Sequence, residues 1–190
     1  MNKKHYLFIL LIICFGSATS QIPDFYREDL FFVLDDNSLH VSGDYYFNNP
    51  HEQPIKIALA YPFPQDKVMG KVTNVYSFDK NSIFQEQLFR YNQRAARIKL
   101  FIRPSKSTIL RIGYTQEIHS NKAIYILTTT AAWGKPFQQA YYELHVPFDI
   151  NIDSLSYTPD KIQQVGGLYI YIFERNNFMP DRDFEIYFSK

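Results

Sequence analysis

The sequence predicts an all-β protein, a two-sheet antiparallel β-sandwich of about ten strands. Aromatic residues make up 17% of the chain, there are only seven glycines, and short segments of alternating apolar and polar residues recur between turn signals. About ten such segments, with no linker, repeat or low-complexity stretch between them, fit two packed sheets. We therefore expect a single domain over residues 21–190.

Residues 1–20 have the composition of a secretory signal peptide. A basic start precedes an unbroken apolar run over residues 6–15, and Ala18 and Ser20 stand at the −3 and −1 positions of a cleavage site before Gln21. A run of about ten apolar residues is about half of what a membrane span requires. We expect cleavage before Gln21, export to the periplasm or the outside of the cell, and no transmembrane helix in the mature chain.

The single cysteine, Cys14, lies inside this segment. The mature chain would then have no thiol for a disulfide, a thiolate metal site or a cysteine nucleophile. Cys14 could also be a lipid-modified cysteine, but the bulky Ile13 before it fits that pattern poorly. The formal net charge of +1 favours no nucleic-acid partner. The chain has no Gly-x-Ser-x-Gly, no His-Glu-x-x-His and no Gly-rich phosphate loop, so we expect no cofactor.

The strands follow one another from the first hairpin onward. Residues 35–38 form a turn, and alternate residues of the next strand share one apolar face. Further strands are predicted at residues 55–61, 68–78, 97–103, 108–118, 123–130, 141–146, 168–173 and 184–188. Segments 123–127 and 168–173 are apolar on both faces, which predicts central strands or strands beneath a partner. Residues 83–94 fit a helix and a strand equally well.

Four stretches of the chain are similar to an uncharacterised family of exported bacterial β-sandwich domains. They are Glu28-Asp29-Leu30, Tyr45-Tyr46-Phe47-Asn48-Asn49, Ala60-Tyr61-Pro62-Phe63-Pro64 and the segment from Tyr125 to Pro136. The resemblance covers most of the mature chain. It implies an exported β-sandwich and no known activity.

Basic residues gather in one part of the sequence, with no Asp or Glu between Gln87 and Gln116. They are Arg90, Arg94, Arg97, Lys99, Arg103, Lys106 and Arg111. Strand alternation places Arg97, Lys99 and Arg103 outside, and Ile98, Leu100 and Ile102 inside. Such a stripe could bind a lipid headgroup, an acidic glycan or an acidic envelope protein. The alternative is an ordinary solvated sheet face.

Trp133 is the only tryptophan, and the sequence places it in a loop. Its ring could stack on a sugar or anchor a protein partner. Alternatively, it packs the loop onto the end of the sandwich.

Glu143 and His145 are two residues apart, so a strand would place both side chains on one face. The pair could serve acid–base catalysis, with the carboxylate orienting the imidazole. The alternative is a solvated polar pair. Asp149, Asn151 and Asp153, with Asp160 further on, loosely resemble a calcium loop. Ser154 stands where such a loop needs glycine, so we favour the polar face of a strand. The histidines His40, His51 and His119 show no metal-ligand spacing.

These observations predict a non-catalytic, exported binding or structural module of the bacterial cell envelope. A small outer-membrane β-barrel is one alternative, because short alternating strands rich in aromatic residues are also its signature. A secreted hydrolase that uses Glu143 and His145 is the other.

Overall fold

The computed structural model describes residues 21–81 and 89–190. These residues are all-β: they form thirteen strands and one short 3-10 helix. The signal peptide predicted for residues 1–20 lies outside the described residues, as do residues 83–88 of the ambiguous segment 83–94. In the described part of that segment, Phe89–Tyr91 is a strand. Within the two described ranges, no helix has the length and apolar character needed to cross a membrane.

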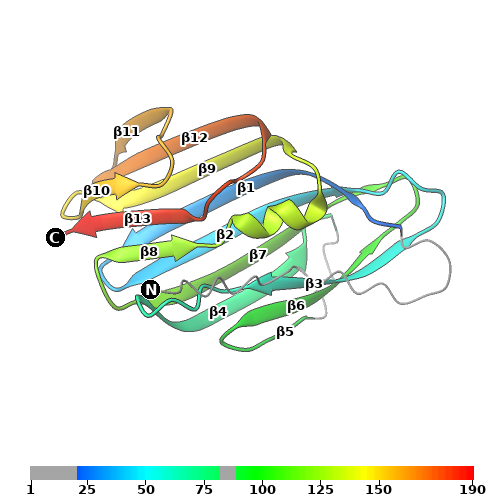
Figure 1. The fold of residues 1–190 in the computed structure, drawn as a ribbon, viewed down its shortest axis with the longest axis horizontal. Coiled ribbons are helices and arrows are strands. Elements are labelled where there is room, and N and C mark those ends of the chain that lie inside the picture. Colours follow the sequence, from blue (N-terminus) through cyan, green and yellow to red (C-terminus); the bar gives the residue numbers. More distant parts are fainter. Residues whose placement is uncertain (1–20, 82–88) are drawn as a thin grey trace, which may run out of the picture.

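A seven-stranded sheet forms one layer of the molecule (Figure 1). Its strands, in spatial order, are β11 (Lys161–Val165), β12 (Leu168–Phe178), β9 (Phe137–Pro147), β1 (Asp24–Asp35), β2 (Ser38–Asn48), β7 (Ser107–Ile118) and β4 (Met69–Asp79). The predicted turn at residues 35–38 is confirmed, because β1 and β2 pair as a hairpin across it.

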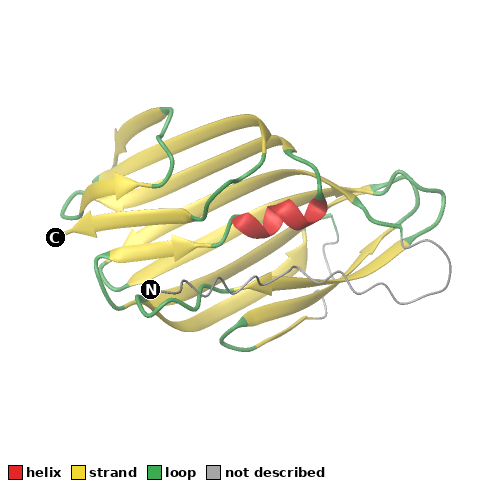
Figure 2. Ribbon diagram, in the orientation of Figure 1, coloured by secondary structure: helices red, strands yellow, loops and turns green. Residues whose placement is uncertain are grey.

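Two three-stranded sheets cover one face of the large sheet (Figure 1). One contains β10 (Asn151–Leu155), β13 (Phe184–Ser189) and β8 (Lys122–Tyr125), and the other contains β3 (Ile55–Pro62), β6 (Ala95–Ile102) and β5 (Phe89–Tyr91). The helix η1 (Thr128–Trp133) lies on the same side (Figure 2). The prediction of two sheets is therefore wrong in its count: the second layer is divided into two separate sheets.

The prediction of a purely antiparallel arrangement is also wrong. β1 pairs in parallel with β9, in a register that runs from Arg27 opposite Gln139 to Val33 opposite His145. A parallel pair needs a long crossover connection, and here the chain passes through both the large and the small sheets before it returns. Strand periodicity gives no information on such a distant partner.

The core lies between the two layers. The inner residues of β1 include Leu30, Phe32 and Leu34, all fully buried. The Phe32 ring stacks on the Phe184 ring of β13, with 5.0 Å between ring centroids. Tyr45 of β2 meets the Tyr61 ring of β3 at 5.8 Å. Each small sheet is therefore fixed to the large sheet by aromatic contacts.

The strand predicted over residues 123–130 ends earlier, at Tyr125. The Asp183 carboxylate accepts hydrogen bonds from the backbone N–H groups of Leu127 and Thr128, at 3.1 Å each, which removes these donors from a strand ladder. A 3-10 turn follows, and Gly134 closes it at φ 69°. β8 is an edge strand rather than a central one, although Ala123, Ile124 and Tyr125 are buried. β12 lies between β11 and β9, as its apolar pattern predicts.

Candidate functional site

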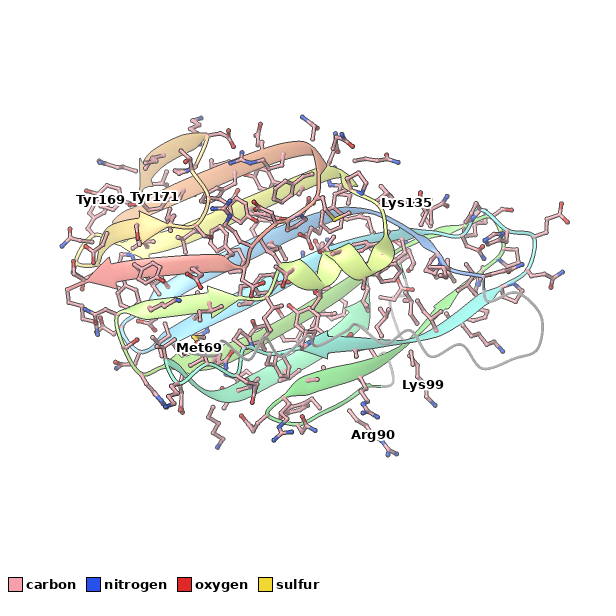
Figure 3. All side chains as sticks on the ribbon, viewed as in Figure 1. Met69, Arg90, Lys99, Lys135, Tyr169 and Tyr171 are labelled. Atoms are coloured by element: carbon pink, nitrogen blue, oxygen red, sulfur yellow. The ribbon has the colours of Figure 1, made fainter. Side chains whose placement is uncertain are left out.

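The basic sheet face is the outer surface of the small sheet β3-β6-β5. We define it by Lys56, Arg90, Arg97, Lys99 and Phe101, all exposed. Arg90 and Lys99 point away from the body of the molecule in Figure 3. The alternation predicted for β6 is confirmed, because Ile98, Leu100 and Ile102 are buried.

Strand register brings the cations of this face together. Arg90 on β5 stands directly opposite Arg97 on β6. Lys56 on β3 is opposite Phe101, and its ammonium lies 5.7 Å from the centroid of the Phe101 ring, which is 47% exposed. Ion pairs among the described residues involve none of these cations. Like charges directly opposite each other on a sheet are destabilising.

The other members of the basic segment have different positions. Arg103 is exposed and lies one residue beyond the end of β6. Arg111 belongs to β7 in the large sheet, where its Nε and Nη2 donate to the buried Asp44 carboxylate at 2.6 and 2.5 Å. Burial alone would raise the pKa of Asp44, but the hydrogen bonds from Arg111 and Lys80 outweigh it and lower that pKa. Arg111 therefore neutralises an internal carboxylate and does not extend the basic sheet face.

Trp133 lies at the end of η1 rather than in a loop. Its ring makes an edge contact with the Phe25 ring at 5.3 Å and a tilted contact with the Phe47 ring at 5.6 Å. Trp133 thus packs onto the sandwich, as the alternative interpretation of the sequence proposed. It also forms part of a pocket that the sequence does not reveal.

The interlayer pocket is a cavity of about 60 Å³ at the division between the two small sheets. β1, β2 and β7 of the large sheet form its floor, β3 forms one wall, and β8 and η1 form the other. Six aromatic residues line it: Phe25, Tyr45, Phe47, Tyr61, Tyr125 and Trp133. The pocket exists because the second layer is not continuous over β2.

Three tyrosine hydroxyls at the pocket form a closed ring of hydrogen bonds. Tyr45 donates to Tyr61 at 2.9 Å, and Tyr61 donates to Tyr125 at 3.2 Å. The hydroxyls of Tyr125 and Tyr45 are 2.8 Å apart. A phenol has one donor, so the ring closes when Tyr125 donates to Tyr45. Burial raises the pKa of all three tyrosines, which therefore stay neutral.

Among the described residues, Glu28 is the one acidic residue that lines the interlayer pocket. It is 2% exposed, and its Oε1 accepts a hydrogen bond of 2.5 Å from the Tyr142 hydroxyl. Burial raises the pKa of Glu28 to about 8, and the nearby Asp29 charge adds to this, although the hydrogen bond from Tyr142 opposes it. A carboxyl group that is neutral at pH 7 and lies in an aromatic pocket is typical of a binding or catalytic site.

Glu143 and His145 lie on one face of β9, as predicted. His145 Nε2 and Glu143 Oε2 are 2.8 Å apart, and the Tyr141 hydroxyl donates to Glu143 Oε1. This row is on the face of the large sheet opposite the interlayer pocket, because the intervening Tyr142 and Leu144 are buried in the core. No described serine or threonine is hydrogen-bonded to His145.

Asn151 and Asp153 are exposed residues of β10, and Asp149 is an exposed residue that precedes it. Asp153 accepts a hydrogen bond of 2.8 Å from the Ser189 hydroxyl. Asp160, the distant member of the loosely matched calcium loop, instead binds the Arg175 guanidinium and the backbone N–H of Glu174. The ranges 21–81 and 89–190 contain no group of three His, Cys, Asp or Glu side chains placed to hold a metal ion.

The three other histidines of the described ranges, His40, His51 and His119, have no contact partners in common. His40 is hydrogen-bonded to the hydroxyls of Ser38 and Thr115, whereas His119 lies 3.7 Å from Glu117 Oε2. The backbone N–H of His51 donates a hydrogen bond to the side-chain oxygen of Asn49. They therefore remain separate polar residues.

The sequence does contain a signal for Glu28. Strand alternation places Glu28 on the same face as Leu30, Phe32 and Leu34, which is where a buried carboxylate would stand out. The meeting of Tyr45, Tyr61 and Tyr125 carries no such signal, because these residues belong to three strands of three different sheets.

No family model and no curated protein matches the chain. Its fold resembles that of a candidate nutrient-binding protein from Legionella pneumophila, with a TM-score of 0.69 and 12% identity over 90% of this chain and 68% of that chain. It also resembles M1 zinc metallopeptidase structures from Deinococcus radiodurans, one of them bound to a Tyr-Ser-Ala substrate. Here the TM-score is 0.55 and the identity 12%, over 87% of this chain and 42% of the metallopeptidase chain.

The chain thus spans less than half of the metallopeptidases that it resembles. At 12% identity, both likenesses show the fold alone. Other proteins therefore share the overall fold of this chain.

Proposed function

We propose that this protein is a non-catalytic binding module of the bacterial cell envelope, exported by the signal peptide at residues 1–20, and that the basic sheet face docks on an anionic phospholipid surface. A binding role is compatible with the name of the Legionella protein, which is a candidate nutrient-binding protein. The pairing of Arg90 with Arg97 carries the proposal.

The basic sheet face has an excess of positive charge. Four cations lie on a sheet of only three short strands, and two of them are directly opposed. Their repulsion costs stability unless anions cover the face. Lipid phosphates supply such anions, and each Lys or Arg near an anionic membrane contributes about 1 kcal/mol of binding.

The aromatic ring of Phe101 favours a lipid surface over a soluble polyanion. It is half-exposed between Lys99 and Lys56 on the basic sheet face. An apolar ring among cations suits the boundary between headgroups and acyl chains, where the ring can leave water while the cations bind phosphate. An acidic polysaccharide is the competing partner.

Sedimentation with vesicles tests this function. The purified protein should bind vesicles of equal parts phosphatidylglycerol and phosphatidylcholine, and should not bind phosphatidylcholine alone. Replacing Arg90, Arg97 and Lys99 by Ser should reduce binding about 100-fold, as about 1 kcal/mol per cation implies. Raising the salt from low to physiological concentration should also weaken binding, because exposed charges are screened over about 8–10 Å.

A second triple variant supplies the matched control. Lys67, Lys71 and Lys161 are exposed lysines outside the basic sheet face, so replacing them by Ser changes the net charge equally. This variant should keep vesicle binding. If both triple variants lose binding to the same extent, or if the protein binds an acidic polysaccharide column and not the vesicles, the proposed function is wrong.

A further inference from the structure

We propose that the interlayer pocket is a binding site for a small organic ammonium ion, which the Glu28 carboxylate holds as its counter-ion among the aromatic rings. This site is separate from the basic sheet face and does not depend on it. The geometry of the pocket, its hydrogen-bond acceptors and its rings each lead to this class of ligand.

The pocket lies where the fold leaves room for a ligand. Its floor belongs to the large sheet, whereas its two walls come from β3 and from η1, which belong to different parts of the divided second layer. Ligand pockets are commonly found at such junctions between structural units. At about 10–15 Å³ for each water-sized position, a cavity of about 60 Å³ accommodates about four to six heavy atoms.

The polar groups of the pocket are mainly acceptors. In the ring formed by Tyr45, Tyr61 and Tyr125, each hydroxyl uses its single proton on the next oxygen, so that only lone pairs remain for a ligand. Glu28 adds a carboxylate, of which only Oε1 is engaged by Tyr142. Thr129 and Thr130 also line the pocket, and their hydroxyls can donate or accept. The acceptors of the tyrosine ring and of Glu28 therefore suit a ligand that brings donors, and an ammonium group brings up to three.

The rings select a cation. Aromatic faces attract a desolvated cation by about 2 kcal/mol or more, and they repel an anion. Trp133 is held against Phe25 and Phe47 by its edge and tilted contacts, so its ring is already in position. The Glu28 carboxylate offsets the cost of burying the ligand's charge.

Ammonium binding should be coupled to the release of a proton. The pKa of Glu28 is raised to about 8 in the empty pocket, so at pH 7 the ammonium ion must displace the carboxyl proton. The titratable groups around Glu28 are Tyr142 on β9, Tyr45 on β2, Tyr125 on β8 and the adjacent Asp29. The tyrosines stay neutral over this range, so affinity should rise with pH up to about 8 and then level off.

The unaltered protein can test the ligand class directly. Trp133 is the only tryptophan in the chain and lies in the pocket wall, so its fluorescence reports occupancy. Three probes with the same number of heavy atoms and different charge are n-butylammonium, 1-butanol and propionate. Butylammonium should change the fluorescence in a saturable way, at lower concentration than butanol, and propionate should have no effect.

Two matched variants test the role of Glu28. Glu28→Gln keeps the size of the side chain and an acceptor for Tyr142, and it should weaken butylammonium binding at least about tenfold while butanol binding stays the same. Glu143→Gln changes a carboxylate on the opposite face of the large sheet and should have no effect. Equal binding of the three probes, no response to any of them, or undiminished butylammonium binding by Glu28→Gln would each refute the ammonium site.

Discussion

The Tyr142 hydroxyl donates to Glu28 Oε1 at 2.5 Å and so joins β9 to β1 inside the core. Burial nevertheless dominates the ionisation of this carboxyl and raises its pKa from 4.5 to about 8. In the unfolded chain the same group is exposed and returns to its ordinary pKa. Folding is therefore linked to proton uptake between these two values.

The first prediction concerns the pH dependence of stability. The folded state binds the Glu28 proton more tightly than the unfolded state, so protonation of Glu28 contributes to the free energy of unfolding. This contribution is complete below about pH 4.5 and is lost as the pH rises to about 8. Between pH 5 and 9 the loss should be on the order of 4 kcal/mol. Urea unfolding at pH 5, 7 and 9 measures it.

Glu28→Gln should remove this pH dependence, because the amide does not titrate, and Glu143→Gln should retain it. A free energy of unfolding that falls by the same amount in all three proteins would contradict the assignment to Glu28.

The second prediction compares a buried tyrosine whose hydroxyl is hydrogen-bonded with one whose hydroxyl is not. Tyr61→Phe opens the hydroxyl ring and leaves a buried donor on Tyr45 without its acceptor, which should cost about 1–3 kcal/mol. Tyr114 is equally buried on β7, but its hydroxyl has no hydrogen-bond partner among the described residues. Tyr114→Phe should therefore be neutral or stabilising. Thermal unfolding of the two variants provides the comparison, and equal losses would disprove the ring.

The third prediction compares two glycines of the large sheet. A Cβ at Gly43 would lie 2.4 Å from the Tyr45 hydroxyl, which is buried and is held by hydrogen bonds to Tyr61 and Tyr125. A Cβ at Gly113 would lie 2.1 Å from the Tyr76 ring, but Tyr76 is exposed and its ring can move aside. Gly43→Ala should cost about 1–3 kcal/mol, and Gly113→Ala clearly less. Chemical denaturation measures both, and the reverse order would be incompatible with this packing.

Much of the fold could be predicted because a half-buried strand shows its two faces in the sequence. Ile98, Leu100 and Ile102 are buried as alternation predicts, and the hairpin turn at residues 35–38 is correct. Alternation describes one strand at a time, however, and it contains no information on which strand lies beside which. The parallel partner of β1 and the division of the second layer therefore could not be predicted.

In the candidate site, too, only those features could be predicted that depend on alternation within one strand. The outward positions of Arg97 and Lys99 depend on local alternation alone and agree with the structure. The repulsive position of Arg90 depends on the pairing of β5 with β6, and the interlayer pocket depends on how three sheets pack. Trp133 stands out in the sequence as a single residue, but its neighbours Phe25 and Phe47 lie far away along the chain.

The parallel pair of β1 and β9 also has a consequence for the order of folding. Arg27 meets Gln139, a residue 112 positions later, so one edge of β1 has no partner until β9, at residues 137–147 of 190, has been synthesised. Closing so long a loop is slow, and an open strand edge pairs readily with other chains in the meantime. Nascent chains that stop before β9 should therefore self-associate, and the full-length chain should escape aggregation only once its C-terminal third is available.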